Sequence, residues 1–145
     1  METKKFDELT NKELYNLLKE RTLVFVVEQN CPYLEVDGKD PYSYHLFKED
    51  NGQIIAYLRI VPAGITYPET SIGRVFVKKE YRGQGIAEEL LQRGLDIIQN
   101  ELKETTVKIQ AQDYLRKFYG YFGFQAISEI YLEDNIPHVD MLLQR

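Results

Sequence analysis

The sequence has very few of the residues that form covalent cross-links or bind metal ions. Its 145 residues include one cysteine, Cys31, and two histidines. A single cysteine cannot form an internal disulfide, and two separated histidines with one cysteine lack the spacing of a metal site. We therefore expect no disulfide, no metal ion and a reducing compartment, the cytoplasm.

Long apolar segments and an excess of basic residues are missing as well. No apolar run approaches the roughly 20 residues that cross a bilayer, and the first residues lack the apolar core of a signal peptide. The formal net charge is −5, which argues against nucleic acid as a partner because duplexes attract basic surfaces. There is no repeat or low-complexity linker, so the length predicts one domain over residues 1–145.

The apolar periodicity predicts helices and strands in alternation. A capping box at Thr10 and Glu13 begins a helix over residues 11–22. The stretch 23–29 is compatible with a strand or with more helix, and residues 30–44 and 62–70 are predicted loops. The other expected elements are strands at 45–47, 54–61 and 72–77, a helix at 85–100, a strand at 105–111, a helix at 114–122, and strands at 126–132 and 138–143.

This order predicts an α/β (α+β) fold in which one central, mixed, mostly antiparallel sheet carries helices on both faces. The unit from residue 72 to residue 111 has the strand–helix–strand pattern of a right-handed parallel crossover. Ligands of such units bind at the carboxyl ends of the strands. We expect the functional site at that edge of the sheet.

The turn between the strand at 72–77 and the helix at 85–100 is the most informative segment. It reads Arg82-Gly83-Gln84-Gly85-Ile86-Ala87, and glycines there allow main-chain amides to converge on a phosphate at a helix N-terminus. It lacks the Gly-Lys-Ser/Thr ending of a mononucleotide loop, and Glu88 stands where a dinucleotide fingerprint needs a small residue. An ordinary tight turn would also explain it.

The pattern Arg82-x-x-Gly85-x-Ala87 resembles the pyrophosphate loop of the Gcn5-related N-acetyltransferases (GNAT). The run Phe118 to Phe124 resembles an aromatic motif late in that family. Further segments resemble its ElaA-like branch, namely Arg21 with Val24 to Asp37, Gly73-Arg74-Val75, Ala111-Gln112 and Ile136-Pro137-His138. The resemblance covers nearly the whole chain and implies the GNAT, or acyl-CoA N-acyltransferase, fold.

The resemblance also implies acetyl-CoA as co-substrate and a set of residues that bind it. Amides of the turn would bind the pyrophosphate, the main chain of the preceding strand would pair with pantetheine, and Gln112 would bond the cofactor where many relatives have Asn. Leu115 stands where relatives have a small residue. The cofactor-binding residues expected on this basis are Val75, Phe76, Val77, Arg82, Gly83, Gln84, Gly85, Ile86, Ala87, Gln112 and Tyr119.

Two catalytic roles follow from the resemblance and from proton chemistry. Tyr119 matches the family tyrosine that hydrogen-bonds the coenzyme sulfur and protonates the leaving thiolate, with Tyr121 as the second choice. A base must also take a proton from an ammonium acceptor. Glu28 ranks first, because an acid after an apolar run is expected near the core, and His138 ranks second. The remaining candidates are Glu35, Asp37 and His45.

We therefore expect an N-acetyltransferase in which a primary amine, on a small molecule or a peptide, attacks the thioester directly. Cys31, beside Pro32, is expected to be an apolar filler rather than a nucleophile. Arg74, inside an apolar strand, would bind an acidic group of the acceptor or pair with a carboxylate. Two alternatives stay open, a non-catalytic acyl-CoA sensor and a transferase with another acyl donor. A homodimer is compatible with either.

Overall fold

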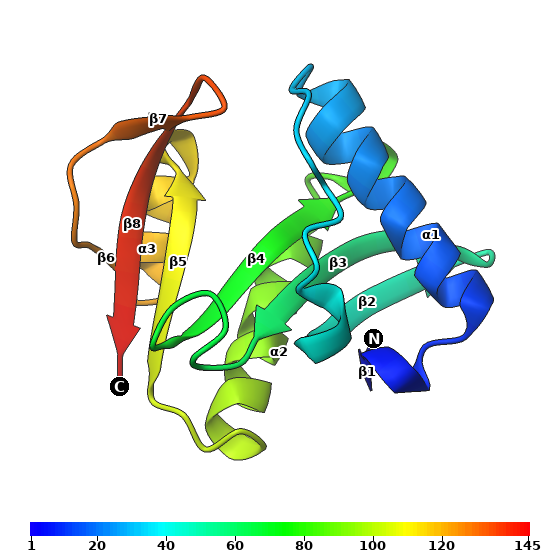
Figure 1. The fold of residues 1–145 in the computed structure, drawn as a ribbon, viewed down its shortest axis with the longest axis horizontal. Coiled ribbons are helices and arrows are strands. Elements are labelled where there is room, and N and C mark those ends of the chain that lie inside the picture. Colours follow the sequence, from blue (N-terminus) through cyan, green and yellow to red (C-terminus); the bar gives the residue numbers. More distant parts are fainter.

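The computed structural model describes residues 1–145 as an open, mixed sheet of eight strands flanked by helices (Figure 1). The strand order is β1-β2-β3-β4-β5-β8-β6, and β7 pairs with β8. The strands are β1 (Glu2–Lys5), β2 (Tyr44–Asp50), β3 (Gln53–Val61), β4 (Thr70–Val77), β5 (Thr106–Gln112), β6 (Gln125–Ala126), β7 (Tyr131–Glu133) and β8 (Ile136–Gln144). The α-helices are α1 (Asn11–Thr22), α2 (Ile86–Asn100) and α3 (Arg116–Tyr121).

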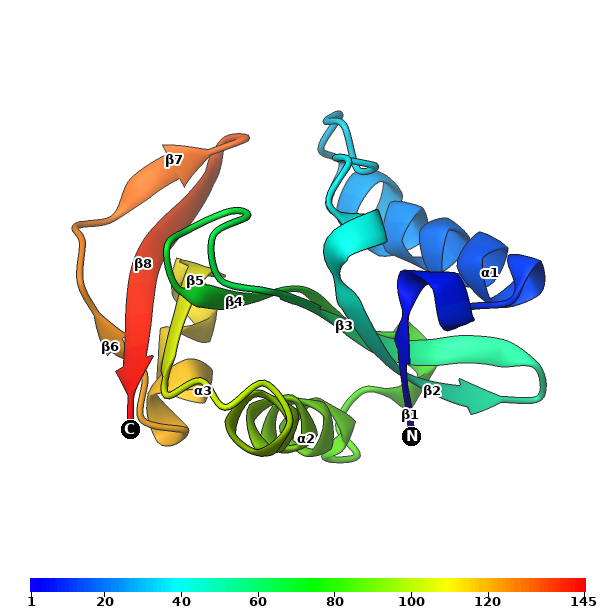
Figure 2. The ribbon, with the colours of Figure 1, turned by 60° about the horizontal axis from the view of Figure 1, so that its bottom comes forward.

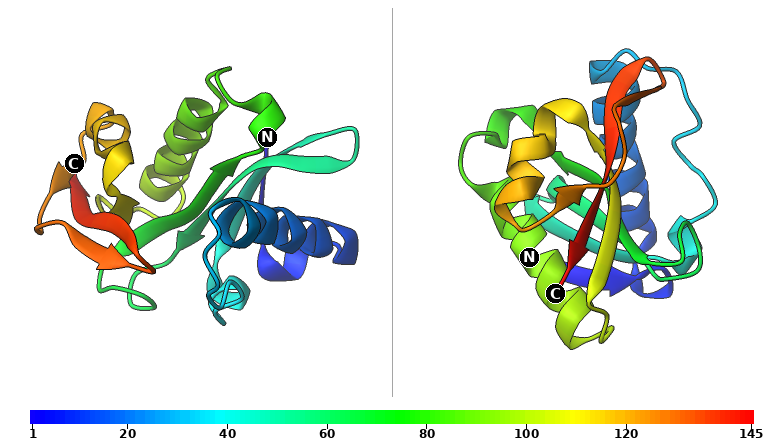
Figure 3. Two further views of the ribbon diagram at one scale, coloured as in Figure 1. Left: turned by 90° about the horizontal axis from the view of Figure 1, so that it is seen from above. Right: turned by 90° about the vertical axis from the view of Figure 1, so that its left-hand side faces the viewer.

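The helices cover both faces of the sheet, as the sequence predicts. Helix α1 lies on one face and packs over β3, whereas α2 and α3 lie on the other (Figures 2 and 3). The apolar side of α2, with Leu91, Leu95 and Ile98, joins the larger core, while Leu17 of α1 packs into a smaller core with Phe76. None of the helices is both long and apolar enough to cross a membrane.

Strands β4 and β5 run parallel but pair only briefly. The register has two pairs, Thr70 with Val107 and Ser71 with Lys108, at the beginning of both strands. Beyond these pairs the strands diverge (Figure 1), and β5 continues its ladder with β8 instead. The inner edges of both strands, from Ile72 to Val77 and from Ile109 to Gln112, are therefore left without a strand partner.

The structure differs from the expected elements at both edges of the sheet. Strand β1 was not predicted, because its sequence Glu-Thr-Lys-Lys has no apolar alternation. The single strand expected at 126–132 is wrong, because the segment splits into β6 and β7. Between them the amide of Ile127 donates to Asp140 (2.9 Å), and the hydroxyl of Ser128 accepts from the amide of Asp140 (2.9 Å). The side chain of Ser128 thus accepts a hydrogen bond that a main-chain carbonyl would accept in a continuous strand.

The ambiguous stretch after α1 is helical, not a strand. Residues Leu23–Glu28 form η2, a π-helix that continues α1. Single π-turns are rare and often occur at functional sites. Here η2 ends the helix beside β4, which places Glu28 close to the turn at residues 82–87.

A buried cluster of charges fixes the loop between η2 and β2. Arg21, fully buried, pairs with Glu35 and with Asp40 (2.7 Å). Arg59 pairs with Asp37 (2.8 Å) and with Asp40 (3.1 Å). A third arginine, Arg74, pairs with Glu35 (2.5 Å) and with Asp37 (3.3 Å). Three arginines from α1, β3 and β4 therefore balance three carboxylates of one loop.

His45 lies beneath this cluster and is held in its neutral form. Its Nε2 donates to the carbonyl of Asp40 (3.0 Å), and its Nδ1 accepts from the hydroxyl of Tyr57 (2.6 Å). Burial lowers the pKa of His45 below its usual value. Because both ring nitrogens are occupied by the fold, His45 has a structural role and is not available as a base.

The buried, neutral state of His45 predicts how the stability of the fold changes with pH. In the unfolded state, the imidazole takes up a proton below a pKa of about 6.5. Folded His45 stays neutral to lower pH. The stabilisation is therefore fully present above pH 6.5 and declines below it. The free energy of unfolding should fall between pH 7 and pH 5.5 by up to about 1.4 kcal/mol per pH unit. In chemical denaturation, the free energy of unfolding of His45→Gln should depend less on pH than that of wild type. Identical slopes for His45→Gln and wild type would contradict this role.

Candidate functional site

A cleft of about 920 Å³ opens where β4 and β5 diverge. One wall is formed by η2 and the loop that follows it, and the other by β5, α3 and the β7–β8 turn. The floor of the cleft is formed by β4 and by the turn that leads into α2. The expected residues that line it are Glu28, Asp37, Val75, Phe76, Val77, Arg82, Gly83, Gly85, Ile86, Ala87, Gln112, Tyr119 and His138. Gln84 is exposed on the same turn but does not line the cleft.

A β-bulge shapes strand β4 within the cleft. The pairs Tyr57–Phe76 and Arg59–Gly73 flank a step at which Leu58 alone faces Arg74 and Val75. Arg74 has a left-handed φ of 52°, which bends the strand and alters the direction of the next main-chain groups. The edge of β4 that would otherwise have paired with β5 is therefore open to the cleft at Val75 and Val77.

The turn between β4 and α2 presents a row of unused main-chain donors. Gly83 and Gly85 both have φ of 80°, and Gly85 caps α2 without any side-chain hydrogen bond. The amides of residues 83 to 88 donate to no other group of the protein, and the first one that does is that of Glu89, to Gly85 (3.2 Å). The amide of Arg82 is not among them, because it donates to Lys79 (3.3 Å). These free amides lie at the positive end of a 15-residue helix.

The side chain of Arg82 spans two elements instead of extending into solvent. Its guanidinium forms a two-point ion pair with Glu28 (2.9 and 3.0 Å), and its Nε donates to the carbonyl of Val77 (2.8 Å). The Glu28 side chain is 41% exposed. The expectation that Glu28 is held near the core is therefore wrong, since η2 turns this acid outward after its apolar run.

Tyr119 of α3 lies buried in the wall of the cleft. Its ring packs edge-on against Phe118 and Phe124, at centroid distances of 5.2 and 5.9 Å, while its hydroxyl makes no hydrogen bond within the protein. Burial raises the pKa of Tyr119, with a smaller effect from Tyr114, so the phenol keeps its proton at neutral pH. The second choice, Tyr121, is 84% exposed and lies outside the cleft.

The remaining expected residues are divided between the cleft and the buried cluster. Gln112, at the end of β5, reaches across to Gln29 (3.4 Å), and Leu115 also lines the cleft. Burial alone would raise the pKa of Asp37, but its hydrogen bonds with Arg59 hold that pKa well below the usual range. Glu35 accepts from Tyr33 (2.8 Å) and is paired with arginines. Neither carboxylate is a free base.

Several cleft residues were not singled out from the sequence. They come from the two long loops that carry no readable motif, from β3 (Arg59), and from the end of β7 and the turn that follows it (Glu133 and Asp134). The only signals were the unusual length of the loop at 30–44 and the turn pair Asp134-Asn135. These residues are Tyr33, Lys39, Arg59, Thr66, Tyr67, Glu133 and Asp134.

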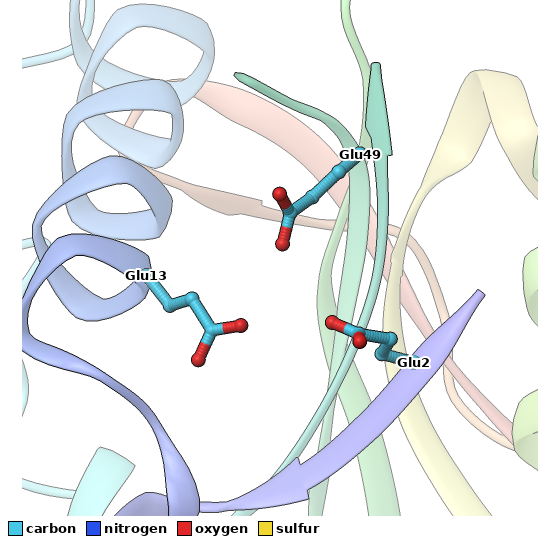
Figure 4. A group of neighbouring side chains, drawn as sticks. All are labelled: Glu2, Glu13 and Glu49. Carbon is cyan, nitrogen blue, oxygen red and sulfur yellow. The ribbon is translucent and has the colours of Figure 1, made fainter. Parts of the chain in front are cut away.

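A second group of acidic side chains lies away from the cleft. Glu2, Glu13 and Glu49, from β1, α1 and β2, have carboxylate oxygens within 4.8 Å of one another (Figure 4). The ammonium of Lys4 donates to both oxygens of Glu13 (2.9 and 3.0 Å). Such exposed clusters are common on protein surfaces, and we assign no ligand to this one.

Comparison with known proteins identifies the family. A family model for the acetyltransferase (GNAT) domain matches residues 12–145. Protein ElaA of Escherichia coli K12 is 38% identical over 136 residues, which are 92% of this chain and 89% of ElaA. The crystal structure of Escherichia coli ElaA superposes with a TM-score of 0.93 at 35% identity, covering 99% of this chain and 97% of that one.

Two further structures share the fold. An acyl-CoA N-acyltransferase from Pseudomonas aeruginosa has a TM-score of 0.93 at 44% identity, covering 98% of this chain and 97% of that one. An aminoglycoside 6'-N-acetyltransferase complexed with coenzyme A has a TM-score of 0.73 at 13% identity, covering 99% and 97%. The chain belongs to the GNAT acetyltransferase family, in its ElaA-like branch, and is an acyltransferase.

Proposed function

We propose that this protein transfers an acetyl group from acetyl-CoA to a primary amine by direct attack, and that residues 1–145 form one domain that carries the whole site. The observation that carries the proposal is the convergence of three features in one cleft. These are the free amides at residues 83 to 88, the unpaired edge of β4 and the buried hydroxyl of Tyr119. Each one matches a different part of an acyl-CoA.

The diphosphate of the coenzyme fits the turn before α2. Consecutive main-chain donors at a helix N-terminus, where the helix dipole supplies roughly half a positive charge, stabilise a bound anion. Glycines at 83 and 85 keep this surface free of Cβ atoms, so phosphate oxygens can approach the backbone. Residues Gly83, Gln84, Gly85, Ile86 and Ala87 would donate through their amides.

The pantetheine arm fits the unpaired edge of β4. Its two amides are spaced along an extended chain, so they can hydrogen-bond the main chain of residues 75 to 77 as an added strand would. This arrangement uses the backbone of Val75, Phe76 and Val77, while the Phe76 side chain stays in the small core against Tyr57 (centroid distance 5.8 Å). Gln112 on the opposite edge would contact the same arm.

The reaction then needs attack at the thioester and protonation of sulfur. Holding the amine and the thioester in one cleft supplies much of the rate acceleration. The nitrogen lone pair attacks the carbonyl carbon, the C–S bond breaks, and the Tyr119 hydroxyl gives its proton to the departing sulfur. Tyr119 suits this role because its hydroxyl is unpartnered and burial keeps it protonated.

Direct attack is favoured over an acyl-cysteine intermediate. Cys31 lines the cleft, but its thiol donates to the carbonyl of Asp134 (3.6 Å). Burial raises the pKa of Cys31, with a further contribution from Asp134. A protonated thiol is a poor nucleophile, so this cysteine is not poised to accept an acyl group.

Removing the Tyr119 hydroxyl should separate catalysis from binding. Tyr119→Phe should lower the rate of acetyl transfer roughly 10²-fold, because the thiolate then leaves without a proton donor, while the affinity for CoA stays unchanged. Thiol release with a panel of primary amines measures the rate, and calorimetry measures the affinity. Tyr121→Phe, on the exposed side of α3, is the control and should match wild type. A Tyr119→Phe enzyme with wild-type turnover would rule out the proton transfer.

The turn makes a second prediction. Gly85→Ala should weaken CoA binding at least tenfold, because a left-handed φ costs an alanine about 1–2 kcal/mol and relaxation moves the amides. Gly52→Ala is the matched control, since Gly52 has a similar φ of 75° in the β2–β3 turn, where a Cβ meets no atom within 4 Å. Both variants should lose similar stability, and Gly85→Ala alone should lose affinity in calorimetry. Equal CoA affinities would place the diphosphate elsewhere.

The same assays distinguish the proposed function from the two alternatives, an acyl-CoA sensor and a transferase with another acyl donor. A non-catalytic acyl-CoA sensor would bind acetyl-CoA without releasing thiol with any amine. A transferase for another acyl group would release thiol faster with propionyl-CoA or succinyl-CoA than with acetyl-CoA. We expect acetyl-CoA to have the highest kcat/KM.

A further inference from the structure

Most groups in or near the cleft that could act as a base are already occupied. Glu35 and Asp37 are paired with arginines, and His45 uses both ring nitrogens inside the fold. Glu28 is bound at both oxygens by Arg82. A base needs a free lone pair, and of the five bases expected from the sequence only His138 keeps one in the cleft.

His138 lies where three strands meet at the cleft. It is near the beginning of β8, opposite Gln112 of β5 on one side and opposite Tyr131 of β7 on the other. The rings of His138 and Tyr131 stack at a centroid distance of 6.3 Å and an interplanar angle of 26°. The hydroxyl of Tyr131 is itself held by Asp140 (2.5 Å). The imidazole is therefore fixed in orientation and is only half-buried.

The hydrogen bonding of the ring determines which nitrogen is basic. Nδ1 of His138 lies 2.7 Å from the carbonyl oxygen of Ile136. A carbonyl can only accept, so in the neutral ring Nδ1 carries the hydrogen and Nε2 keeps its lone pair. No group of the protein hydrogen-bonds Nε2. This is the tautomer that a general base requires.

The charges around His138 favour a cationic acceptor on the same side of the cleft. Across the strand stands the neutral Gln112, and the stacked neighbour is the neutral Tyr131. Glu133 and Asp134, from the β7–β8 turn, line the same cleft and form no ion pair, and Asp140 is engaged with Tyr131. The arginines of the cleft come from β3, β4 and the turn before α2, and each is paired with a carboxylate.

We propose that Nε2 of His138 is the general base that removes a proton from the ammonium of the acceptor, directly or through one water molecule. This inference rests on the proposed function. The proton moves from the ammonium nitrogen to Nε2, the freed lone pair forms the C–N bond, and the C–S bond breaks as Tyr119 protonates sulfur. The second nitrogen proton then restores the Tyr119 hydroxyl through solvent, and the imidazolium returns its proton to water.

The tautomer can be tested without any acceptor. Because the chain has only two histidines, a ¹⁵N–¹H spectrum of the ring nitrogens of wild type and His45→Gln assigns both. We expect neutral His138 to carry its hydrogen on Nδ1, with a basic Nε2. A hydrogen on Nε2 in the neutral ring would overturn the proposal whatever the enzyme acylates.

The catalytic role is tested with two amine probes. Benzylamine is an ammonium at neutral pH and needs a base, whereas aniline is already neutral. His138→Gln should lower kcat/KM for benzylamine about 10²-fold at pH 7, with a much smaller loss for aniline and with unchanged CoA affinity. His45→Gln, assayed at pH 8 after circular dichroism has shown that it is folded, is the control and should keep wild-type rates.

The outcomes for this inference and for the proposed function are distinct. Equal losses with both amines would show that His138 only supports the shape of the cleft, and an unchanged kcat/KM would exclude it altogether. If wild type released no thiol with any amine, the proposed function would fail instead. The ring-nitrogen spectrum would then still decide whether Nε2 is the free nitrogen.

Discussion

The short pairing of β4 with β5 is the constraint on which the rest of the site depends. Parallel strands normally continue their ladder along their length, and here the ladder stops after two pairs. Two features end it, since the bulge at Arg74 bends β4 and β8 occupies the other edge of β5. The result is a polar edge in the middle of a sheet that faces a cleft, where a ligand with amide groups can take the place of a strand.

The buried charge cluster serves the site by fixing its outer wall. The loop that follows η2 leaves the apolar side chains of Leu34 and Val36 exposed, so apolar packing contributes little to holding it. Arg21, Arg59 and Arg74 hold it from three different elements. Desolvation makes a buried ion pair a weak source of stability, but geometric matching at several points gives the loop one position. Arg74 therefore connects the bulge in β4 to the loop that forms this wall of the cleft.

The sequence was most informative for short local segments. The turn at Gly83 and Gly85 and the aromatic run around Tyr119 were singled out from neighbouring residues, and the structure places these three residues at one cleft. The predictions that failed concern contacts between residues that lie far apart in the sequence. The exposure of Glu28 follows from the π-helical turn and from Arg82, 54 residues later. The division of 126–132 depends on a hydrogen bond between Ser128 and Asp140 that no periodicity reveals.

The balance of three cations and three anions also limits how such a protein can evolve. Loss of Asp40 alone would leave Arg21 and Arg59 with less compensation in a dry environment, and such unpaired buried charges are strongly destabilising. Joint replacement by apolar residues of similar volume is far better tolerated. Substitutions of the three arginines and the three carboxylates should therefore occur together among descendants of this protein. The exposed residues Leu34 and Val36 of the same loop should vary independently of them.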